Sequence, residues 1–213
     1  MKNTKKSFTL VELLCAAALI VILAGIGFSA FSYASYRGKE AATKSLITRI
    51  AAGLETLKTK HGFYPSTSKK DGDKVTKHFT QIIVTMDNDG IISAIKFKKV
   101  KKESDPTAEI IAEIKDLKKV KDFLSVADAE NIKKHLVSDS GTDYFLTDGW
   151  GGKIYYAYPG FFNTVKFDLL APGADGAVGK NAVEINSEED IPTNKNAYID
   201  SNEWACDDIT NFQ

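Results

Sequence analysis

The hydrophobic pattern opens with one long apolar stretch near the N-terminus. Between Glu12 and Arg37 no charged side chain occurs over the 24 residues 13–36. A bilayer-spanning helix needs about 20 consecutive apolar residues, so this stretch predicts a transmembrane helix with some tilt. Three lysines within the first six residues precede it, and basic residues beside a span favour the cytoplasmic side. The pattern therefore predicts a single span with its N-terminus in the cytoplasm.

After the apolar stretch, the pattern changes to a single stripe on one helix face. Apolar residues recur at spacings of three and four, which is the period of a helix that buries one side. Glu40 and Lys44 add a favourable pair on the other side, and Gly62 with Pro65 predicts the end of the helix. We therefore expect one helix over residues 8–61 whose second half docks onto a sheet. The stripe consists of Leu46, Ile47, Ile50, Leu54 and Leu57.

The middle of the chain predicts a hairpin followed by two helices. Phe79–Met86 and Ile91–Val100 are the strands of the hairpin, because apolar and polar residues alternate around a turn rich in Asp, Asn and Gly. The first helix is expected to start at Asp105-Pro106 and the second at Ser125. The apolar side of the first helix would consist of Ile110, Ile111, Ile114 and Leu117, and that of the second of Val126, Ala129, Ile132 and Leu136.

Charge is balanced overall but unevenly distributed. The chain has 28 basic and 28 acidic residues, whereas residues 138–213 contain 4 basic and 13 acidic groups. Such an acidic segment repels nucleic acid and attracts hard cations or basic partners. We therefore expect no nucleic-acid binding.

Candidate catalytic chemistry is absent from the sequence pattern. The three histidines, His61, His78 and His135, are scattered and belong to no zinc-protease or hydrolase motif. Cys15 lies in the apolar stretch and Cys206 near the other end, so no disulfide framework is expected. The sequence predicts a protein that is not an enzyme.

The N-terminal string carries a resemblance to a known family. A short basic leader, the small residue Ser7, and then Phe8-Thr9-Leu10-Val11-Glu12 resemble the signature of type IV prepilin-like proteins. The resemblance implies cleavage between Ser7 and Phe8, N-methylation of Phe8, and an assembly role for Glu12. An acid inside hydrocarbon costs at least about 2.5 kcal/mol and needs a partner. The new ammonium of Phe8 in a neighbouring copy is the expected partner. A plain signal anchor is the alternative interpretation.

The C-terminal part resembles the major pseudopilins of type II secretion systems. The matching strings are residues 146–152 (L-T-D-G-W-G-G), 154–160 (I-Y-Y-A-Y-P-G), 167–170 (F-D-L-L), 173–176 (G-A-D-G) and 188–191 (E-E-D-I). In that family an acidic loop binds calcium, so the resemblance implies a calcium site at Asp175, Glu189 and Asp190. A merely solvated acidic loop is the alternative.

These expectations together describe an α+β protein of the pilin or pseudopilin type. A long N-terminal helix, transmembrane in its first half, would pack on a small antiparallel sheet, with an inserted hairpin and helices. The expected parts are a leader (1–7), a transmembrane and filament-core helix (8–36), the soluble half of that helix (37–65), a variable insert (66–145), and a C-terminal sheet with the acidic loop (146–213).

The expected function is structural. The chain would be a pseudopilin of a type II secretion-like filament, held in a bacterial inner membrane with its C-terminal domain in the periplasm. Its partners would be its own copies, the prepilin peptidase, the inner-membrane secretion platform and other pseudopilins. Two alternatives remain: a type IV, competence or minor pilin, and a signal-anchored extracytoplasmic domain that binds a ligand.

Overall fold

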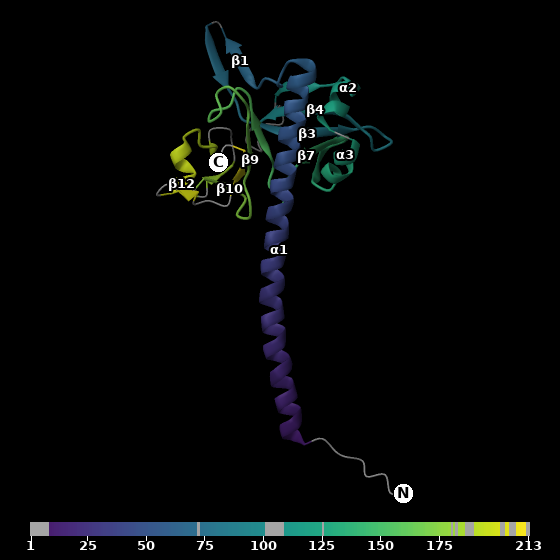
Figure 1. Ribbon diagram of the computed structural model, residues 1–213, viewed down its shortest axis with the longest axis vertical. Helices are drawn as coiled ribbons and strands as arrows, with labels where there is room; N and C mark the ends of the chain where they lie inside the picture. The colour runs from purple at the N-terminus through teal and green to yellow at the C-terminus, as the bar shows by residue number, and fades with distance from the viewer. Residues whose placement is uncertain are drawn as a thin grey trace. The chain divides into compact units, whose positions relative to one another are not determined.

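The computed structural model divides the chain into two compact units, Met1–Lys39 and Glu40–Gln213. It describes residues 9–71, 73–100, 109–124, 126–179, 181, 183–185, 190–200, 203–204 and 208–211. The helix α1 runs without interruption from Leu10 to His61 (Figure 1). It ends as predicted, because Gly62 adopts φ 80° and its N–H donates to the Lys58 carbonyl over 2.9 Å.

The second unit is built on one eight-stranded antiparallel sheet. Six strands follow the order β14-β9-β8-β3-β4-β5, and β7 pairs with both β3 and β6. Five of these strands lie wholly or mostly in the segment expected to be an insert, which therefore supplies the centre and one edge of the sheet. The strands are β3 (Thr80–Met86), β4 (Ile92–Lys99), β5 (Ile110–Ile114), β6 (Leu136–Ser140), β7 (Asp143–Leu146), β8 (Tyr155–Ala157), β9 (Asp168–Ala171) and β14 (Ile209–Thr210).

Shorter elements complete the second unit. The described residues include two further helices, α2 (Leu117–Phe123) and α3 (Val126–Lys133), and the 3-10 turn η2 (Lys195–Ala197). In the part of the chain that the structure describes, three two-stranded pairs lie outside the main sheet. They are β1 (Ser68–Asp71) with β2 (Lys74–Lys77), β10 (Ala177–Val178) with β11 (Val183–Glu184), and β12 (Ile199–Asp200) with β13 (Glu203–Trp204).

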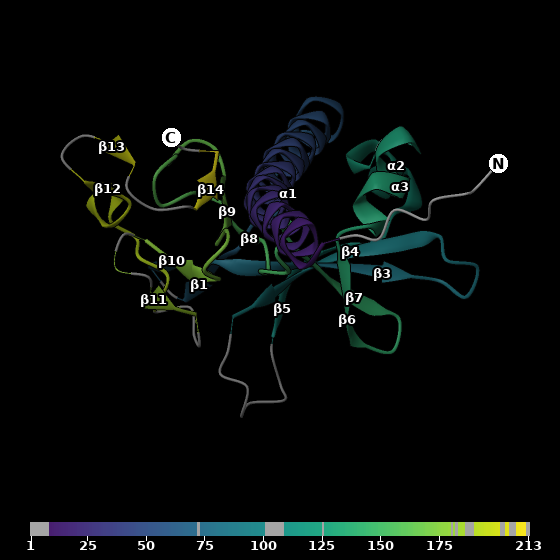
Figure 2. The ribbon, with the colours of Figure 1, turned by 90° about the horizontal axis from the view of Figure 1, so that it is seen from below.

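Each face of the sheet contributes to its own core, because side chains alternate along a strand. On one face, the stripe of α1 packs with Tyr156 and Leu169, and all five stripe residues are at most 4% exposed. The helices α2 and α3 lie on this same side (Figure 2). On the other face, Tyr155 and Leu170 pack with Tyr198 and other residues of the C-terminal segment. The α+β class, with a long helix packed on an antiparallel sheet, is confirmed.

Two local predictions, the hairpin and one ion pair on α1, are confirmed. The hairpin forms as β3 and β4 in antiparallel register, with Val84 opposite Ile95. The predicted helix pair also forms, because Lys44 Nζ lies 2.7 Å from Glu40 Oε1.

The helix expected across Ile110–Leu117 is wrong. Residues 110–114 form β5, which pairs with β4 so that Ile114 lies opposite Ile95, and only Leu117 belongs to a helix. Isoleucine favours strands, and the ladder with β4 satisfies the backbone that a helix would otherwise pair internally. The proposed start at Asp105-Pro106 lies outside the described residues. Instead, Asp116 caps α2 by accepting the Lys118 N–H over 2.9 Å.

The helix expected after Ser125 is confirmed in its first part as α3. Ile132 is buried as expected, but Leu136 lies in β6 rather than on the helix. Ser125 itself lies outside the described residues.

Candidate functional site

The first candidate site is the start of α1, where Thr9 and Glu12 cap the helix reciprocally. The Glu12 Oε2 atom accepts both the Thr9 N–H and the Thr9 hydroxyl, each over 2.9 Å. In return, the Glu12 N–H donates to Thr9 Oγ1 over 3.2 Å. This arrangement is a capping box, in which residues three apart satisfy helix-end donors that otherwise have no partner. The carboxylate is thus held in one orientation at the helix start.

The segment that follows is apolar and uncovered in the isolated chain. Within the described residues, α1 is the one helix whose length and composition suffice to cross a membrane, and its most apolar window is not buried at all. Glu12 is the only charged residue between Thr9 and Arg37. The carboxylate therefore stands alone at the edge of a long apolar surface.

The predicted processing site lies next to this capping box. Ser7 and Phe8 fall outside the described residues, so cleavage between them and methylation of Phe8 remain predictions. What the structure adds is the helix that begins at Leu10 and the orientation of Glu12 toward Thr9.

The second candidate site, the acidic loop, is incomplete in the part of the chain that the structure describes. Asp175 is exposed, and its Oδ1 accepts the Ala177 N–H over 2.9 Å in a local turn. Asp190 is half-buried, and Glu189 lies outside the described residues. Among the described residues, no three His, Cys, Asp or Glu side chains gather closely enough to hold a metal ion. Glu189 is the third residue of the predicted set, so calcium binding at this loop stays a prediction.

Sequence reasoning missed the role of Asp148, a buried acid in the string T-D-G-W-G. Its Oδ1 accepts the N–H groups of Trp150 and Gly152 over 2.9 and 2.8 Å, and its Oδ2 accepts that of Gly173 over 3.1 Å. A Cβ on Gly152 would lie 2.9 Å from this carboxylate. The glycine is thus needed for the close approach, and the carboxylate acts as a backbone anchor rather than as a metal ligand.

Asp168 plays a matching role in the string F-D-L. It is fully buried, and it accepts the N–H groups of Phe162 and Asn163 over 2.8 and 3.0 Å. Burial raises the pKa of Asp168, while these backbone donors and the charge of Lys77 oppose that rise. An aspartate beside a short loop is the sequence signal for such anchors, because Asp side chains bind nearby backbone N–H groups in turns. The loop follows Asp148 and precedes Asp168.

One further contact joins the helix to the Asp148 turn. Thr43 on α1 is fully buried, and its hydroxyl oxygen accepts the Gly149 N–H over 2.8 Å. A proline at position 149 would have no N–H to donate, so this contact requires another residue there.

Comparison with known proteins bears on the first site. Residues 2–28 match the family model described as the prokaryotic N-terminal methylation motif. A search of curated proteins and a search of solved structures found no match. The motif is that of subunits processed by prepilin peptidase, and it points to a structural subunit rather than an enzyme. Together with the apolar helix α1, it is consistent with a single-pass, membrane-anchored protein, and it supports a type IV pilin-like family for this chain.

Proposed function

We propose that this chain is a pseudopilin, the subunit of a filament in a type II secretion-like machine. Peptidase cleavage between Ser7 and Phe8 frees the Phe8 amino group, which is then methylated. The observation that carries the proposal is the methylation motif at residues 2–28, combined with a capped acid, Glu12, at the start of an uncharged helix.

The proposed mechanism is assembly of copies into a filament, without a chemical reaction, and it depends on Glu12. Its Oε2 is occupied by Thr9, whereas its Oε1 accepts no hydrogen bond from the described residues. A carboxylate offers about four lone-pair sites, so the same group can also accept the Phe8 ammonium of a neighbouring copy. Pairing two charges avoids the cost of leaving either one alone in an apolar core. Each copy presents both groups, so the contact repeats head to tail and generates a helical fibre.

The proposed location follows from the charges at the N-terminus. The lysine-rich leader favours a cytoplasmic N-terminus, which places the Glu40–Gln213 unit in the periplasm. On this proposal the chain meets the prepilin peptidase and the secretion platform in the inner membrane, and other pseudopilins in the filament.

Substitution of Glu12 tests the pairing. We expect Glu12→Ala to insert into the membrane at the normal level but to form no filament, because the Phe8 ammonium loses its partner. The matched control is Glu40→Ala, which removes an acid from the same helix outside the apolar stretch. Filament yield is measured by shearing and electron microscopy, and insertion by membrane fractionation. Normal filaments from the Glu12 variant would disprove the pairing.

The mature N-terminus tests processing directly. Mass spectrometry of the native protein is expected to find a chain that begins at methylated Phe8. A mature chain that retains its lysine leader and stays monomeric would instead favour the signal-anchored, ligand-binding alternative.

A type IV, competence or minor pilin is the second candidate, since the methylation motif fits these classes equally. The strings at residues 146–176 support the pseudopilin, because they resemble the major pseudopilins and contain the anchors Asp148 and Asp168. Deletion of the gene separates the two: loss of secreted proteins supports the pseudopilin, and loss of long surface filaments supports the pilin.

Calcium binding by the acidic loop is a separate proposal. Asp175, Glu189 and Asp190 would supply the carboxylates, and loop carbonyls the remaining oxygens that calcium needs. We expect calcium to raise the melting temperature of the protein. An unchanged melting temperature after chelation would remove calcium from the proposed function.

A further inference from the structure

A cavity of about 550 Å³ lies in the second unit, and none of its lining residues belongs to either candidate site. It is formed where β2 leads into β3, beside the end of β4, the loop at residues 160–163 and the segment 191–193. Its volume falls within the roughly 300–1,000 Å³ typical of small-molecule sites. The question is which ligand its lining would select.

The floor of the cavity is apolar and aromatic. Phe79 and Phe161 stack with ring centroids 4.8 Å apart and planes 17° from parallel. Phe79 is fully buried, Ile191 is 1% exposed, and Phe161 is half-buried at the cavity. A floor of this kind favours the apolar body of a ligand over a hydrated ion.

The walls of the cavity are basic. Lys77 and Lys99 line it, and Thr193 adds a hydroxyl at its rim, while no described lining residue is acidic. Lys77 is fixed in place, since its Nζ donates to the Gly160 carbonyl over 2.8 Å and lies 5.8 Å from the centroid of the Phe161 ring. An ammonium has three N–H groups, so the single carbonyl leaves donors for a ligand.

The loop that carries Phe161 is held by the buried anchor Asp168. The carboxylate accepts the N–H groups of Phe162 and Asn163, and a Cβ on Gly160 would lie 2.7 Å from its Oδ1. The position of the Gly160 carbonyl, and with it that of Lys77, is therefore set before any ligand arrives. A preorganised wall of this kind lowers the entropic cost of binding.

We propose that this cavity binds a small organic carboxylate with an aromatic or aliphatic body. The carboxylate would accept hydrogen bonds from Lys77 and lie close to Lys99, and the apolar body would pack on Phe161 and Ile191. The lysines favour the negative charge of the ligand, and the apolar floor favours its aromatic or aliphatic part. A ligand therefore needs both features to bind tightly. The site lies wholly within the Glu40–Gln213 unit and does not depend on filament assembly.

The test uses the full chain in nanodiscs of neutral lipid, with phenylacetate as the probe in isothermal titration and ligand-observed NMR. Acetate provides the charge without the body, and phenylacetamide the body without the charge. We expect saturable phenylacetate binding that is stronger by about tenfold than binding of either comparison compound, as for a charge-assisted hydrogen bond added to apolar burial. Absence of saturable binding, or equal binding of acetate, would overturn the proposal.

Variants locate the binding. Lys77→Gln retains a donor for the Gly160 carbonyl but removes the charge, and it is expected to weaken phenylacetate binding by about tenfold. The matched control is Lys74→Gln, an exposed residue of the same strand that does not line the cavity, and it should bind normally. Thermal unfolding checks that each variant is folded. If Lys77→Gln does not fold, Lys99→Gln takes its place with the same expected loss, and unchanged binding in a folded variant disproves the site.

Discussion

At the scale of single residues, Asp148 links parts of the backbone that lie far apart in sequence. Its two oxygens accept three backbone N–H groups, two from its own turn and one from Gly173, 25 residues later. The side chain is 4% exposed, so each lost acceptor would leave a buried N–H unsatisfied. Hydrogen bonds to charged groups contribute about 1.5–3 kcal/mol each, more than neutral ones.

Replacement of Asp148 by Asn should therefore destabilise the fold by about 2–3 kcal/mol. The Asn side chain keeps one oxygen but turns an NH₂ group toward an N–H donor. The matched control is Asp175→Asn at an exposed turn, where one oxygen still accepts the Ala177 N–H, and in calcium-free buffer its effect should stay within about 0.5 kcal/mol. Urea unfolding followed by tryptophan fluorescence measures both. Equal stability of the two variants would contradict the anchoring role of Asp148.

The two residue-level sites differ in what the sequence could reveal. The Thr9–Glu12 capping box is local, since the two residues are three apart and the T-x-x-E pattern is visible in the string. The bond from Gly173 to Asp148 and that from Gly149 to Thr43 join residues 25 and 106 positions apart. Such contacts depend on the completed fold, so no spacing rule predicts them.

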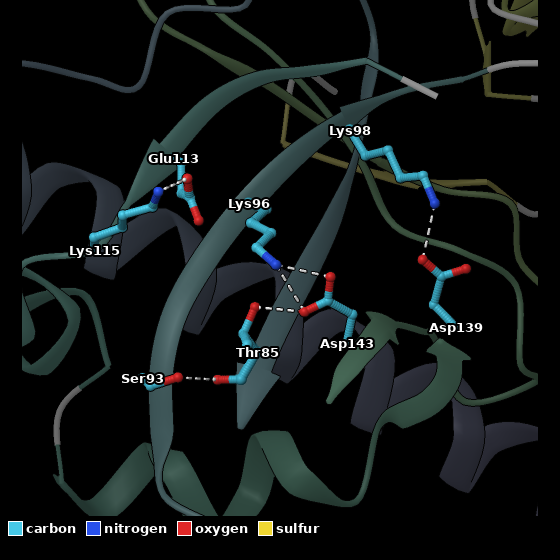
Figure 3. Close-up of polar contacts among 8 residues, drawn as sticks. All are labelled: Thr85, Ser93, Lys96, Lys98, Glu113, Lys115, Asp139 and Asp143. Carbon is cyan, nitrogen blue, oxygen red and sulfur yellow. Dashed lines mark hydrogen bonds and ion pairs between the residues drawn. The ribbon is translucent and has the colours of Figure 1, made fainter. Parts of the chain in front are cut away.

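At the scale of elements, charged side chains link strands of the main sheet that are not adjacent to one another. Lys96 on β4 reaches over β3 to Asp143 on β7, with Nζ 2.8 Å from Oδ2, and Thr85 on β3 donates to the same carboxylate over 2.7 Å (Figure 3). Beside them, Lys98 on β4 pairs with Asp139 on β6 over 2.9 Å. The side chains of Lys96 and Asp143 are only 18% and 20% exposed, so solvent screens this pair less than a surface pair.

The Asp143 contacts predict how stability changes with pH. Partial burial raises the pKa of Asp143, but the hydrogen bonds from Lys96 and Thr85 outweigh it, and the pKa lies below its ordinary value. A lowered pKa means that the carboxylate stabilises the fold above about pH 4, its range in the unfolded chain, and that this contribution is lost as the pH falls through the folded-state value.

We therefore expect Asp143→Asn to lower the free energy of unfolding by roughly 1–3 kcal/mol at neutral pH and to flatten its decline in acid. Urea unfolding at a series of pH values between about 3 and 7 measures this. The control is Glu113→Gln on β5, whose partner Lys115 is 76% exposed, and which should keep the normal pH profile. An unchanged acid decline in the Asp143 variant would rule out the cross-strand role.

The space around two glycines of α1 predicts opposite tolerance of an alanine substitution. A Cβ on Gly53 would overlap the carbonyl oxygen of Phe123, at the end of α2, whereas nothing lies within 4 Å of a Cβ on Gly38. Alanine is favoured over glycine in a helix by about 1 kcal/mol. Gly38→Ala should therefore not lower the melting temperature, while Gly53→Ala should lower it, because α2 must move and overpacking costs about 1–3 kcal/mol. Stabilisation by both substitutions would show that α2 does not pack closely on α1.

The elements also show where hydrophobic spacing is ambiguous. The stripe on the second half of α1 is long enough to identify a helix, and all of its residues are buried as expected. Ile110, Ile111 and Ile114 fit one side of a short helix equally well, yet they form the edge strand β5. Only the pairing with β4 decides between the two, because a five-residue segment takes its structure from its neighbour.

At the scale of the whole molecule, the boundary between the two units falls within a continuous helix. The first unit, Met1–Lys39, contains the apolar segment, whose described large side chains are exposed in the isolated chain. The second, Glu40–Gln213, contains both hydrophobic cores, and the five stripe residues of α1 belong to the first of these. The first half of α1 thus presents an exposed apolar surface, whereas the second half is stabilised by packing against the sheet.

Truncation at two points of α1 tests this division. A fragment of residues 40–213 should unfold cooperatively with a melting temperature close to that of the full chain, because it keeps every core residue. A fragment of residues 62–213 should not fold, since it lacks five side chains whose individual truncation would cost about 2–5 kcal/mol each, against a total stability of about 5–15 kcal/mol. Near-ultraviolet circular dichroism and amide NMR dispersion distinguish the two. A folded 62–213 fragment would mean that the sheet covers its apolar face without the helix, and the docking of α1 would then serve assembly rather than stability.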